Sequence, residues 1–456
     1  MVFNSIDFIY FFIIFTTIYF LFKNNYHHQN YFILISSLIF YSFWDYRFVF
    51  LLIASTTIDY FFGLLIYNEK KYKSKKLFLV LSISINLLFL FYFKYCNFFI
   101  NSSNTIFNFL NINIKLSFLN IILPIGISFY TFHSLSYIID IYWGKITPTK
   151  NYIAYASFVC FFPQLVAGPI SRAGDMLPKF LRKRVVDYEK ILEGVSQIIF
   201  GFFKKIVVAD SIALYVDNSY NNLHVISDFQ ILLSVLFYSI QIYCDFSGYT
   251  DIALGLGKIF GIEFKLNFDR PYLSKNFSEF WKKWHISLSS WLRDYLYIPL
   301  GGNKYGNFNT NRNLFLTMLL GGLWHGASYN FIIWGSLHGL YLVLGKYIKL
   351  NINSFISICI TFFITTLTWV FFRSQSFNDS IYILNRIFNL NTFNLLEIFT
   401  VVKCLYLIIL LSILDLFFYN YFTKDNTKRY ILNLFILLNI FIFATFSSNA
   451  FIYFQF

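Results

Sequence analysis

Two histidines stand in stretches where an ionisable side chain is costly. His325 lies in Leu323-Trp324-His325-Gly326, between two apolar runs. Ionisable groups inside membrane segments are usually functional or internally paired. Burial disfavours the imidazolium cation, so this histidine is expected to be neutral. A neutral imidazole can accept a proton from a hydroxyl group, which is general-base chemistry. The competing interpretation is a packing histidine hydrogen-bonded to a backbone carbonyl.

The second histidine, His285, lies in an aromatic segment around residues 277–300. Read as one helix, the segment presents a single apolar face formed by Trp281, Trp284, Leu288 and Trp291. It is too polar to span a bilayer and too aromatic for a free loop. The pattern therefore predicts a re-entrant or interfacial helix with tryptophans at headgroup depth. From these surroundings alone, a structural role for His285 is as well supported as a catalytic one.

Two carboxylates, Asp245 and Asp251, lie within one apolar run. At 3.6 residues per turn they fall on different faces of a helix, which argues against a catalytic carboxylate pair. Buried charges need partners, so pairing with Lys or Arg on neighbouring helices is the favoured interpretation. The five cysteines are scattered and include no Cys-x-x-Cys spacing. The sequence thus supports neither a metal site nor a disulfide framework.

The elements that must position these residues are membrane helices. The 456 residues are 57% hydrophobic and only 13% charged, whereas a soluble domain is about a quarter charged. Apolar runs recur from end to end, and most of them are long enough to cross a bilayer; they lie at residues 6–22, 31–43, 48–66, 77–93, 118–139, 152–167, 191–215, 229–258, 313–348, 352–372, 400–419 and 430–448. Some of these runs are long enough to be broken or paired. The sequence predicts an all-α integral membrane protein with about ten to thirteen spanning helices.

One polytopic membrane domain over residues 1–456 is expected, with the catalytic motifs in residues 238–345. The net charge of +14 comes from basic loops between apolar runs. Such loops are typical of segments facing an anionic cytoplasmic leaflet, so nucleic acid is not an expected partner. The basic loop at residues 69–76 is predicted to be cytoplasmic, which places the N-terminus outside. The first run is interpreted as a retained span rather than a cleaved signal peptide.

Several motifs, in order, resemble the membrane-bound O-acyltransferase family. They are Phe162-Pro163-Gln164-Leu165-Val166-Ala167-Gly168-Pro169-Ile170, Tyr243-Cys244-Asp245-Phe246-Ser247-Gly248-Tyr249, Trp284-His285-Ile286-Ser287-Leu288-Ser289, Trp291-Leu292-Arg293-Asp294-Tyr295 and Leu323-Trp324-His325-Gly326. The further stretch Tyr297-Ile298-Pro299-Leu300-Gly301-Gly302-Asn303 is similar to the branch that acetylates bacterial alginate and peptidoglycan. The resemblance covers residues 120–345 firmly and the remainder by hydropathy.

The resemblance implies a tunnel through a bacterial cytoplasmic (inner) membrane. Acetyl-CoA would be the donor from the cytoplasm, and the acceptor hydroxyl would arrive from the other face, on a separate extracytoplasmic acetyltransferase.

 His325 would be the catalytic general base, and His285 would orient or polarise the donor carbonyl. Asp245, Arg293, Asp294 and Trp324 are candidate supporting residues. No metal is implied.

Two alternatives to acetyl transfer remain at this point. The family's teichoic-acid D-alanylation branch shares the histidine motifs, so D-alanyl transfer is a second enzymatic interpretation. A transporter that exports an acyl group without chemistry is a third. The histidine pair with its flanking glycines favours the enzyme, and the chain shows no internal repeat of the kind on which many transporters are built.

Overall fold

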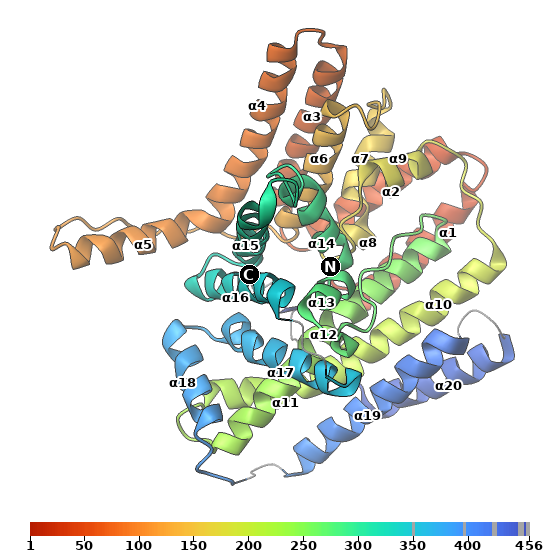
Figure 1. Cartoon of the computed structure of the whole chain (residues 1–456). Helices are drawn as coiled ribbons and strands as arrows, with labels where there is room; N and C mark the ends of the chain where they lie inside the picture. The colour runs from red at the N-terminus through yellow and green to blue at the C-terminus, as the bar shows by residue number, and fades with distance from the viewer. Residues whose placement is uncertain (349–351, 395–397, 422–425, 446–450, 453–456) are drawn as a thin grey trace. The chain divides into compact units, whose positions relative to one another are not determined.

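The computed structural model describes residues 1–348, 352–394, 398–421, 426–445, 451 and 452. Every regular element in these ranges is a helix, in agreement with the predicted class (Figure 1). Five helical stretches are long and apolar enough to cross a membrane, namely Arg47–Asn68, Tyr72–Phe109, Asp228–Ile259, Ser354–Arg373 and Ile398–Phe417. The number of ten to thirteen spans stays a prediction.

The described chain forms two compact units. The first comprises residues 1–186 and 260–264, and the second comprises residues 187–259 and 265–456. The expected single membrane domain over residues 1–456 is not tested by this division and stays a prediction. Both histidines of interest belong to the second unit, together with the helices that carry them.

Helices of the first unit are joined by buried polar contacts. In α3 the carboxylate of Asp59 is fully buried and accepts hydrogen bonds from Ser82 Oγ at 2.7 Å and Asn86 Nδ2 at 2.8 Å, both on α4. The helices of this unit are α1 (Ile6–Leu21), α2 (Tyr26–Ser42), α3 (Arg47–Asn68), α4 (Tyr72–Leu90), a π-helical stretch (Phe91–Tyr95), α5 (Cys96–Phe109), α6 (Ile127–Tyr142), α7 (Tyr152–Cys160), α8 (Phe162–Leu165) and α9 (Ala173–Phe180).

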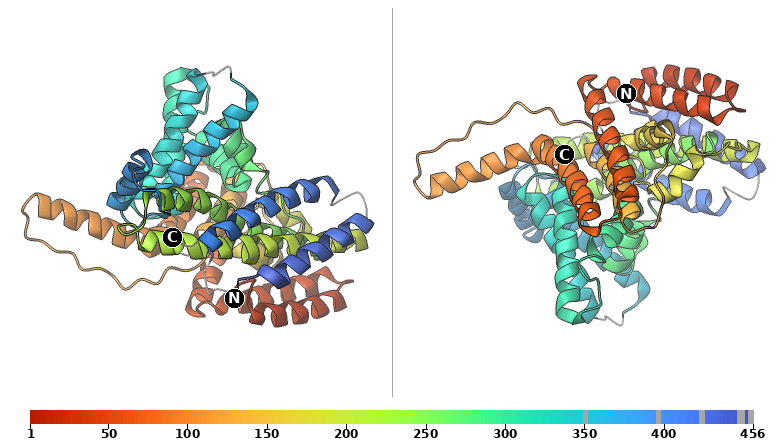
Figure 2. Two further views of the ribbon diagram at one scale, coloured as in Figure 1. Left: turned by 90° about the horizontal axis from the view of Figure 1, so that it is seen from below. Right: turned by 90° about the horizontal axis from the view of Figure 1, so that it is seen from above.

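The structure of residues 96–126 differs from the sequence prediction. A span over 118–139 is expected, but α6 begins only at Ile127, after an extended segment. The chain turns out of α4 into α5, which the prediction missed (Figures 1 and 2). The side chains of Asn97 and Asn104 each exchange two hydrogen bonds of 2.8–3.0 Å with the backbone of the extended segment. Because these backbone groups are hydrogen-bonded to side chains, the segment does not have to form a helix.

The second unit contains every helix of the candidate site. It consists of α10 (Tyr188–Phe202), a π-helical stretch (Phe203–Ala209), α11 (Asp210–Asn221), α12 (Asp228–Ile259), a 3₁₀ turn (Pro271–Leu273), α13 (Phe277–Lys283), α14 (Ile286–Leu292), a second π-helical stretch (Arg293–Tyr297), α15 (Gly306–His325), α16 (Tyr329–Tyr347), α17 (Ser354–Arg373), α18 (Phe377–Phe388), α19 (Ile398–Tyr421) and α20 (Asn426–Phe443). The predicted run 313–348 is thus a pair of helices.

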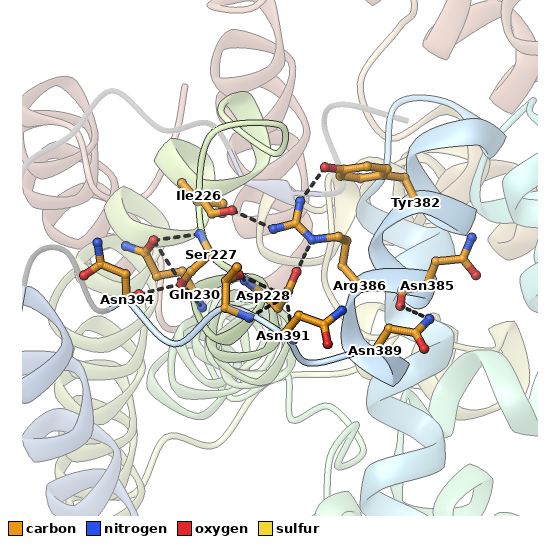
Figure 3. A network of polar contacts seen from close by, with 11 residues as sticks. Ile226, Ser227, Asp228, Gln230, Tyr382, Asn385, Arg386, Asn389, Asn391 and Asn394 are labelled. Carbon is orange, nitrogen blue, oxygen red and sulfur yellow. Dashed lines mark hydrogen bonds and ion pairs between the residues drawn. The ribbon is translucent and has the colours of Figure 1, made fainter.

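The beginning of α12 is fixed by a polar network (Figure 3). Asp228 accepts hydrogen bonds of 2.9 Å from the backbone N–H groups of Asn391 and Thr392, and it pairs with the guanidinium of Arg386 from α18. Arg386 also donates to the carbonyl of Ile226 at 2.9 Å. The network ties the long central helix α12 to α18 and to the loop that follows it.

Candidate active site

His285 forms the turn between α13 and α14. Its backbone adopts a left-handed conformation with φ of +44°, which is uncommon for a residue other than glycine. Its Nδ1 accepts the N–H of Leu288 at 3.3 Å and so caps α14. A nitrogen that accepts a hydrogen bond carries no proton, so the neutral ring carries its proton on Nε2. Burial lowers the pKa of His285 to about 3, which keeps the ring neutral.

A buried asparagine holds this turn in place. The backbone carbonyl of Asn267 accepts the N–H of Ile286 at 2.9 Å, and its Oδ1 accepts the N–H of Ser287 at 3.1 Å and the Ser287 hydroxyl at 2.8 Å. The continuous helix expected around residues 277–300 is therefore wrong. Two short helices meet at Trp284 and His285, because contacts from a distant segment impose the turn.

The tryptophans of the segment do not form the single apolar helix face that the periodicity predicts, because the helix is broken at His285. Trp284 is fully buried, and its ring packs against Phe268 and Trp369 with centroids 5.1 Å away in each case. Trp291 is buried too and packs on Tyr295 at 4.9 Å. These rings pack in the interior of the second unit beside His285, and their depth in the membrane stays a prediction.

His325 is the last residue of α15 and is 4% exposed. Its ring makes edge-on contacts with Trp334 of α16 at 5.1 Å and with Phe372 of α17 at 5.5 Å, measured between centroids. The glycines beside it allow α15 and α16 to approach closely. A Cβ on Gly322 would lie 2.3 Å from the backbone oxygen of Phe331, and one on Gly335 would lie 2.5 Å from that of Met318.

Trp324 links the two histidines. Its ring centroid lies 5.0 Å from that of His325 and 6.3 Å from that of His285, and both contacts are edge-on. Trp324 itself is buried. Two histidines that are 40 residues apart in the sequence thus both contact one indole ring.

A cavity of about 340 Å³ reaches His325. It will be called the inner cavity. Its walls are mainly apolar and include Trp281, Trp334 and Met318, together with Ser278 and Lys282 of α13. Pockets that bind small molecules are typically about 300–1,000 Å³ and have apolar walls with a few polar groups. The arrangement can therefore hold a small, mostly uncharged group against the imidazole of His325.

The structure places the other candidate residues in different roles. Asp245 pairs with Lys205 at 2.7 Å, and Lys205 also pairs with Asp210 at 2.8 Å. Asp251 pairs with Lys204 at 2.9 Å. The predicted structural pairing of both carboxylates is confirmed, and neither of them lines the inner cavity.

Arg293 and Asp294 pair with each other at 2.6 Å. Arg293 lines the inner cavity, although most of its side chain is exposed. Its guanidinium is already engaged by the neighbouring carboxylate, so the pair supplies a nearly neutral polar group at this wall.

A model of the membrane-bound O-acyltransferase family matches residues 146–374, which is half of the chain and contains both histidines and the inner cavity. The chain belongs to the membrane-bound O-acyltransferase family. The resemblance seen in the sequence motifs is therefore confirmed, and the protein is an acyltransferase. The family relation does not test the roles of single residues, so His325 as base and His285 as a polarising group stay predictions.

Several curated proteins are similar to this acyltransferase. The probable alginate O-acetylase AlgI of Pseudomonas putida is 41% identical over 80% of this chain and 76% of its own length. The peptidoglycan O-acetyltransferase of Helicobacter pylori is 36% identical over 79% of this chain and 73% of its own length. The teichoic acid D-alanyltransferase of Bacillus subtilis is 31% identical over 49% of this chain and 59% of its own length.

Sequence reasoning missed several residues of this acyltransferase's site. Asn267, which holds the His285 turn, lies outside every motif and gives no signal in the sequence. Phe246 of α12 packs edge-on to His285 at 4.6 Å. Phe451, near the end of the chain, packs on Phe246 at 5.6 Å. The next residue, Ile452, donates its backbone N–H to Asp245 at 2.8 Å. Of these residues, only Phe246 lies in one of the motifs that resemble the family.

Proposed function

We propose that this chain transfers an acetyl group from acetyl-CoA to a hydroxyl acceptor, for O-acetylation of a polymer outside the cell. The polymer would be peptidoglycan or an alginate-like polysaccharide, and the chain would act in the bacterial cytoplasmic membrane. One observation carries the proposal. His325 lines a mainly apolar cavity, while Trp324 joins it to a second histidine whose proton is on Nε2.

The two histidines suit the two halves of an acyl transfer. His325 takes the proton of the acceptor hydroxyl while the hydroxyl oxygen bonds to the thioester carbonyl carbon. The proposed role of His285, whose ring is buried and does not line the inner cavity, is to donate its Nε2–H to the carbonyl oxygen as negative charge develops there. The tetrahedral intermediate then breaks its C–S bond, and the imidazolium of His325 returns the proton to the departing CoA thiolate. The acetyl ester and free CoA are the products.

A second cavity supports acetyl-CoA as the donor. It measures about 900 Å³, and its walls share Ser278 and Lys282 with the inner cavity. Lys275 also lines it. The ammonium group of Lys282 is exposed and has no hydrogen bond or ion pair within the described residues. Lysine binds phosphate groups well as a point charge, and CoA carries its phosphates at the end remote from the thioester.

D-alanyl transfer to teichoic acid is less well supported. The similar D-alanyltransferase aligns with about half of this chain, whereas the alginate and peptidoglycan relatives align with about four-fifths. A transporter without chemistry lacks the support that family membership gives to an acyltransferase.

We propose that a separate extracytoplasmic protein receives the acetyl group. The inner cavity of about 340 Å³ is suited to a single side chain or a sugar hydroxyl rather than to a glycan strand. A hydroxyl on a partner acetyltransferase would then carry the acetyl group to the polymer.

The test is reconstitution of the purified full chain in vesicles with acetyl-CoA on the cytoplasmic side. We expect slow release of CoA thiol, and His325→Ala should lower this rate by about 10²–10⁴-fold, because a general base is lost. Far-ultraviolet circular dichroism and thermal unfolding should show that the variant is folded. His224→Ala, which removes an exposed histidine outside the site, is the matched control.

Three results would contradict parts of the proposal. Near-normal thiol release by the His325 variant would remove the catalytic role. A donor other than acetyl-CoA, such as a D-alanyl thioester, would change the reaction. Acetylation of polysaccharide by the chain alone, at the rate seen in whole cells, would remove the partner.

A further inference from the structure

His338 of α16 is fully buried and lines neither the inner cavity nor the second cavity. Its Nε2 lies 3.0 Å from the Oγ1 of Thr368 on α17. The Thr368 hydroxyl donates its one hydrogen to the backbone carbonyl of Thr365 at 2.7 Å. The same hydroxyl oxygen must therefore accept a hydrogen bond from His338, so this imidazole carries its proton on Nε2. Two hydrogen bonds in series thus fix the ring of His338 to the backbone of α17.

Four aromatic side chains surround the ring of His338, and each contact is edge-on. The ring centroids of Trp281 and Trp334 lie 5.1 and 4.8 Å from that of His338. Those of Phe277 and Tyr341 both lie at 6.1 Å. Two of these residues belong to α13 and two to α16, and on each helix their spacing of four or seven residues places them on one face. The four side chains will be called the aromatic wall.

The aromatic wall contributes to both cavities of the candidate site. Trp281 and Trp334 line the inner cavity, which reaches His325. Phe277 and Tyr341 line the second cavity, which is proposed to hold CoA. Trp334 also contacts the ring of His325 edge-on at 5.1 Å. A donor with its phosphates in the second cavity and its thioester in the inner cavity lies along this wall, so the wall sets the position of the thioester relative to His325.

We infer that His338 is a positioning residue for acetyl transfer and acts through the aromatic wall. Edge-on contacts depend on the plane of the imidazole, and the hydrogen bond to Thr368 holds that plane in one orientation. Placement matters for the reaction, because a displacement of about 1 Å can lower a rate by about 10²-fold. The inference rests on the proposed function, since the wall has this role only if the thioester approaches His325 from the second cavity.

The test uses the full chain, purified in detergent and labelled with fluorinated tryptophan. The eight tryptophans give fluorine NMR signals that are assigned by substituting each residue in turn. Thr368→Val keeps the shape of the side chain but removes the acceptor of His338. We expect the signals of Trp281 and Trp334 to broaden or split, because the wall then adopts several arrangements. The signal of Trp44, an exposed residue of the first unit, should stay unchanged.

Steady-state thiol release from acetyl-CoA is measured on the same variants. Thr368→Val should lower kcat by about 10–10²-fold and leave KM almost unchanged, because the binding of the CoA phosphates does not involve the wall. Thr368→Ser keeps the hydroxyl and should restore both constants. The matched control is Thr365→Val, which removes a buried hydroxyl that donates to the carbonyl of Thr361 in the same helix at 2.7 Å. This control should behave as the wild type does.

A double variant covers the case in which Thr368→Val does not fold. His338→Phe combined with Thr368→Val removes both polar partners, so neither is left buried and unpaired, and the protein should fold. The signals of Trp281 and Trp334 should still broaden or split, and kcat should still be low.

Sharp, unsplit signals of both tryptophans in the single and the double variant would overturn the role of His338. A wild-type kcat in variants whose tryptophan signals are disturbed would overturn the link to acetyl transfer, and so would an equal loss of kcat in Thr365→Val. If the wild type releases no thiol from acetyl-CoA, the proposed function is wrong, and the fluorine spectra alone decide whether His338 holds the aromatic wall.

Discussion

His285 combines an unusual backbone with a defined side-chain role. The left-handed turn allows its Nδ1 to cap α14 while Nε2 keeps the proton. Burial lowers its pKa to about 3, so the ring remains a neutral donor at physiological pH. A neutral donor that does not change its charge is suited to stabilising an oxyanion. A general base must instead gain a proton, which is the role proposed for His325.

The substitution His285→Asn should separate the helix-capping role of this side chain from its role as a hydrogen-bond donor to the oxyanion. Asparagine tolerates left-handed backbone and is a good N-cap, so α14 should still form. Its shorter amide does not place a donor where Nε2–H lies. We expect kcat for thiol release to fall by about 10²–10³-fold, as for the loss of one oxyanion donor, with little change in KM. Steady-state kinetics on the purified variant measure both constants.

His224→Asn makes the same change at an exposed histidine of the second unit and should retain the wild-type kcat. If His285→Asn keeps its kcat, the ring only caps the helix, and the oxyanion role is wrong. If the variant unfolds at a much lower temperature, the main role of the His285 ring is to cap α14 and not to donate a hydrogen bond to the oxyanion.

At the residue scale, the sequence predicted which residues belong to the candidate site better than it predicted the residues they contact. Intramembrane placement selected His325, and the motifs added His285 and Trp324, which the structure brings together. The pairing of Asp245 with a lysine was predicted from the cost of buried charge, but the sequence could not say that the partner is Lys205. The role of Asn267 could not be predicted from the sequence, because it depends on a contact between distant segments and not on any local pattern.

Among the elements, α15 and α16 bring His325 to the inner cavity through close glycine contacts. Gly322→Ala should lower the unfolding temperature. Alanine favours helix over glycine by up to about 1 kcal/mol, but its Cβ would lie 2.3 Å from the backbone oxygen of Phe331, which cannot move away easily. Overpacking of this kind destabilises by about 1–3 kcal/mol. Differential scanning fluorimetry measures the shift.

The matched control is Gly345→Ala in α16, where an added Cβ meets no atom within 4 Å. This change should leave the unfolding temperature unchanged or raise it, through helix propensity alone. A Gly322→Ala variant as stable as the Gly345→Ala variant would show that α15 and α16 can separate without cost.

Hydropathy predicted the long elements and failed at turns set by side chains. The run 229–258 closely matches α12, and 352–372 closely matches α17. The break between α13 and α14 was missed because the aromatic periodicity continues through it, while Asn267 imposes the turn. The extended segment before α6 was missed for a similar reason: Asn97 and Asn104 satisfy its backbone from α5.

Across the whole molecule, the distribution of charge sets the expected orientation in the membrane. The chain carries 36 Lys and Arg residues against 22 Asp and Glu residues, and the densest basic loop spans residues 69–76. Short loops rich in lysine remain on the cytoplasmic side.

Cysteine labelling in intact cells tests the orientation. Cys96 and Cys359, which are not buried, are first replaced by serine. A cysteine at Lys73, which is exposed at the start of α4, should then resist a membrane-impermeant thiol reagent until the cells are opened. A cysteine at Val2 should react at once, because three predicted spans separate it from the loop and place it outside. Rapid labelling at Lys73 together with protection at Val2 would invert the topology, and acetyl-CoA would then have to approach from the opposite face.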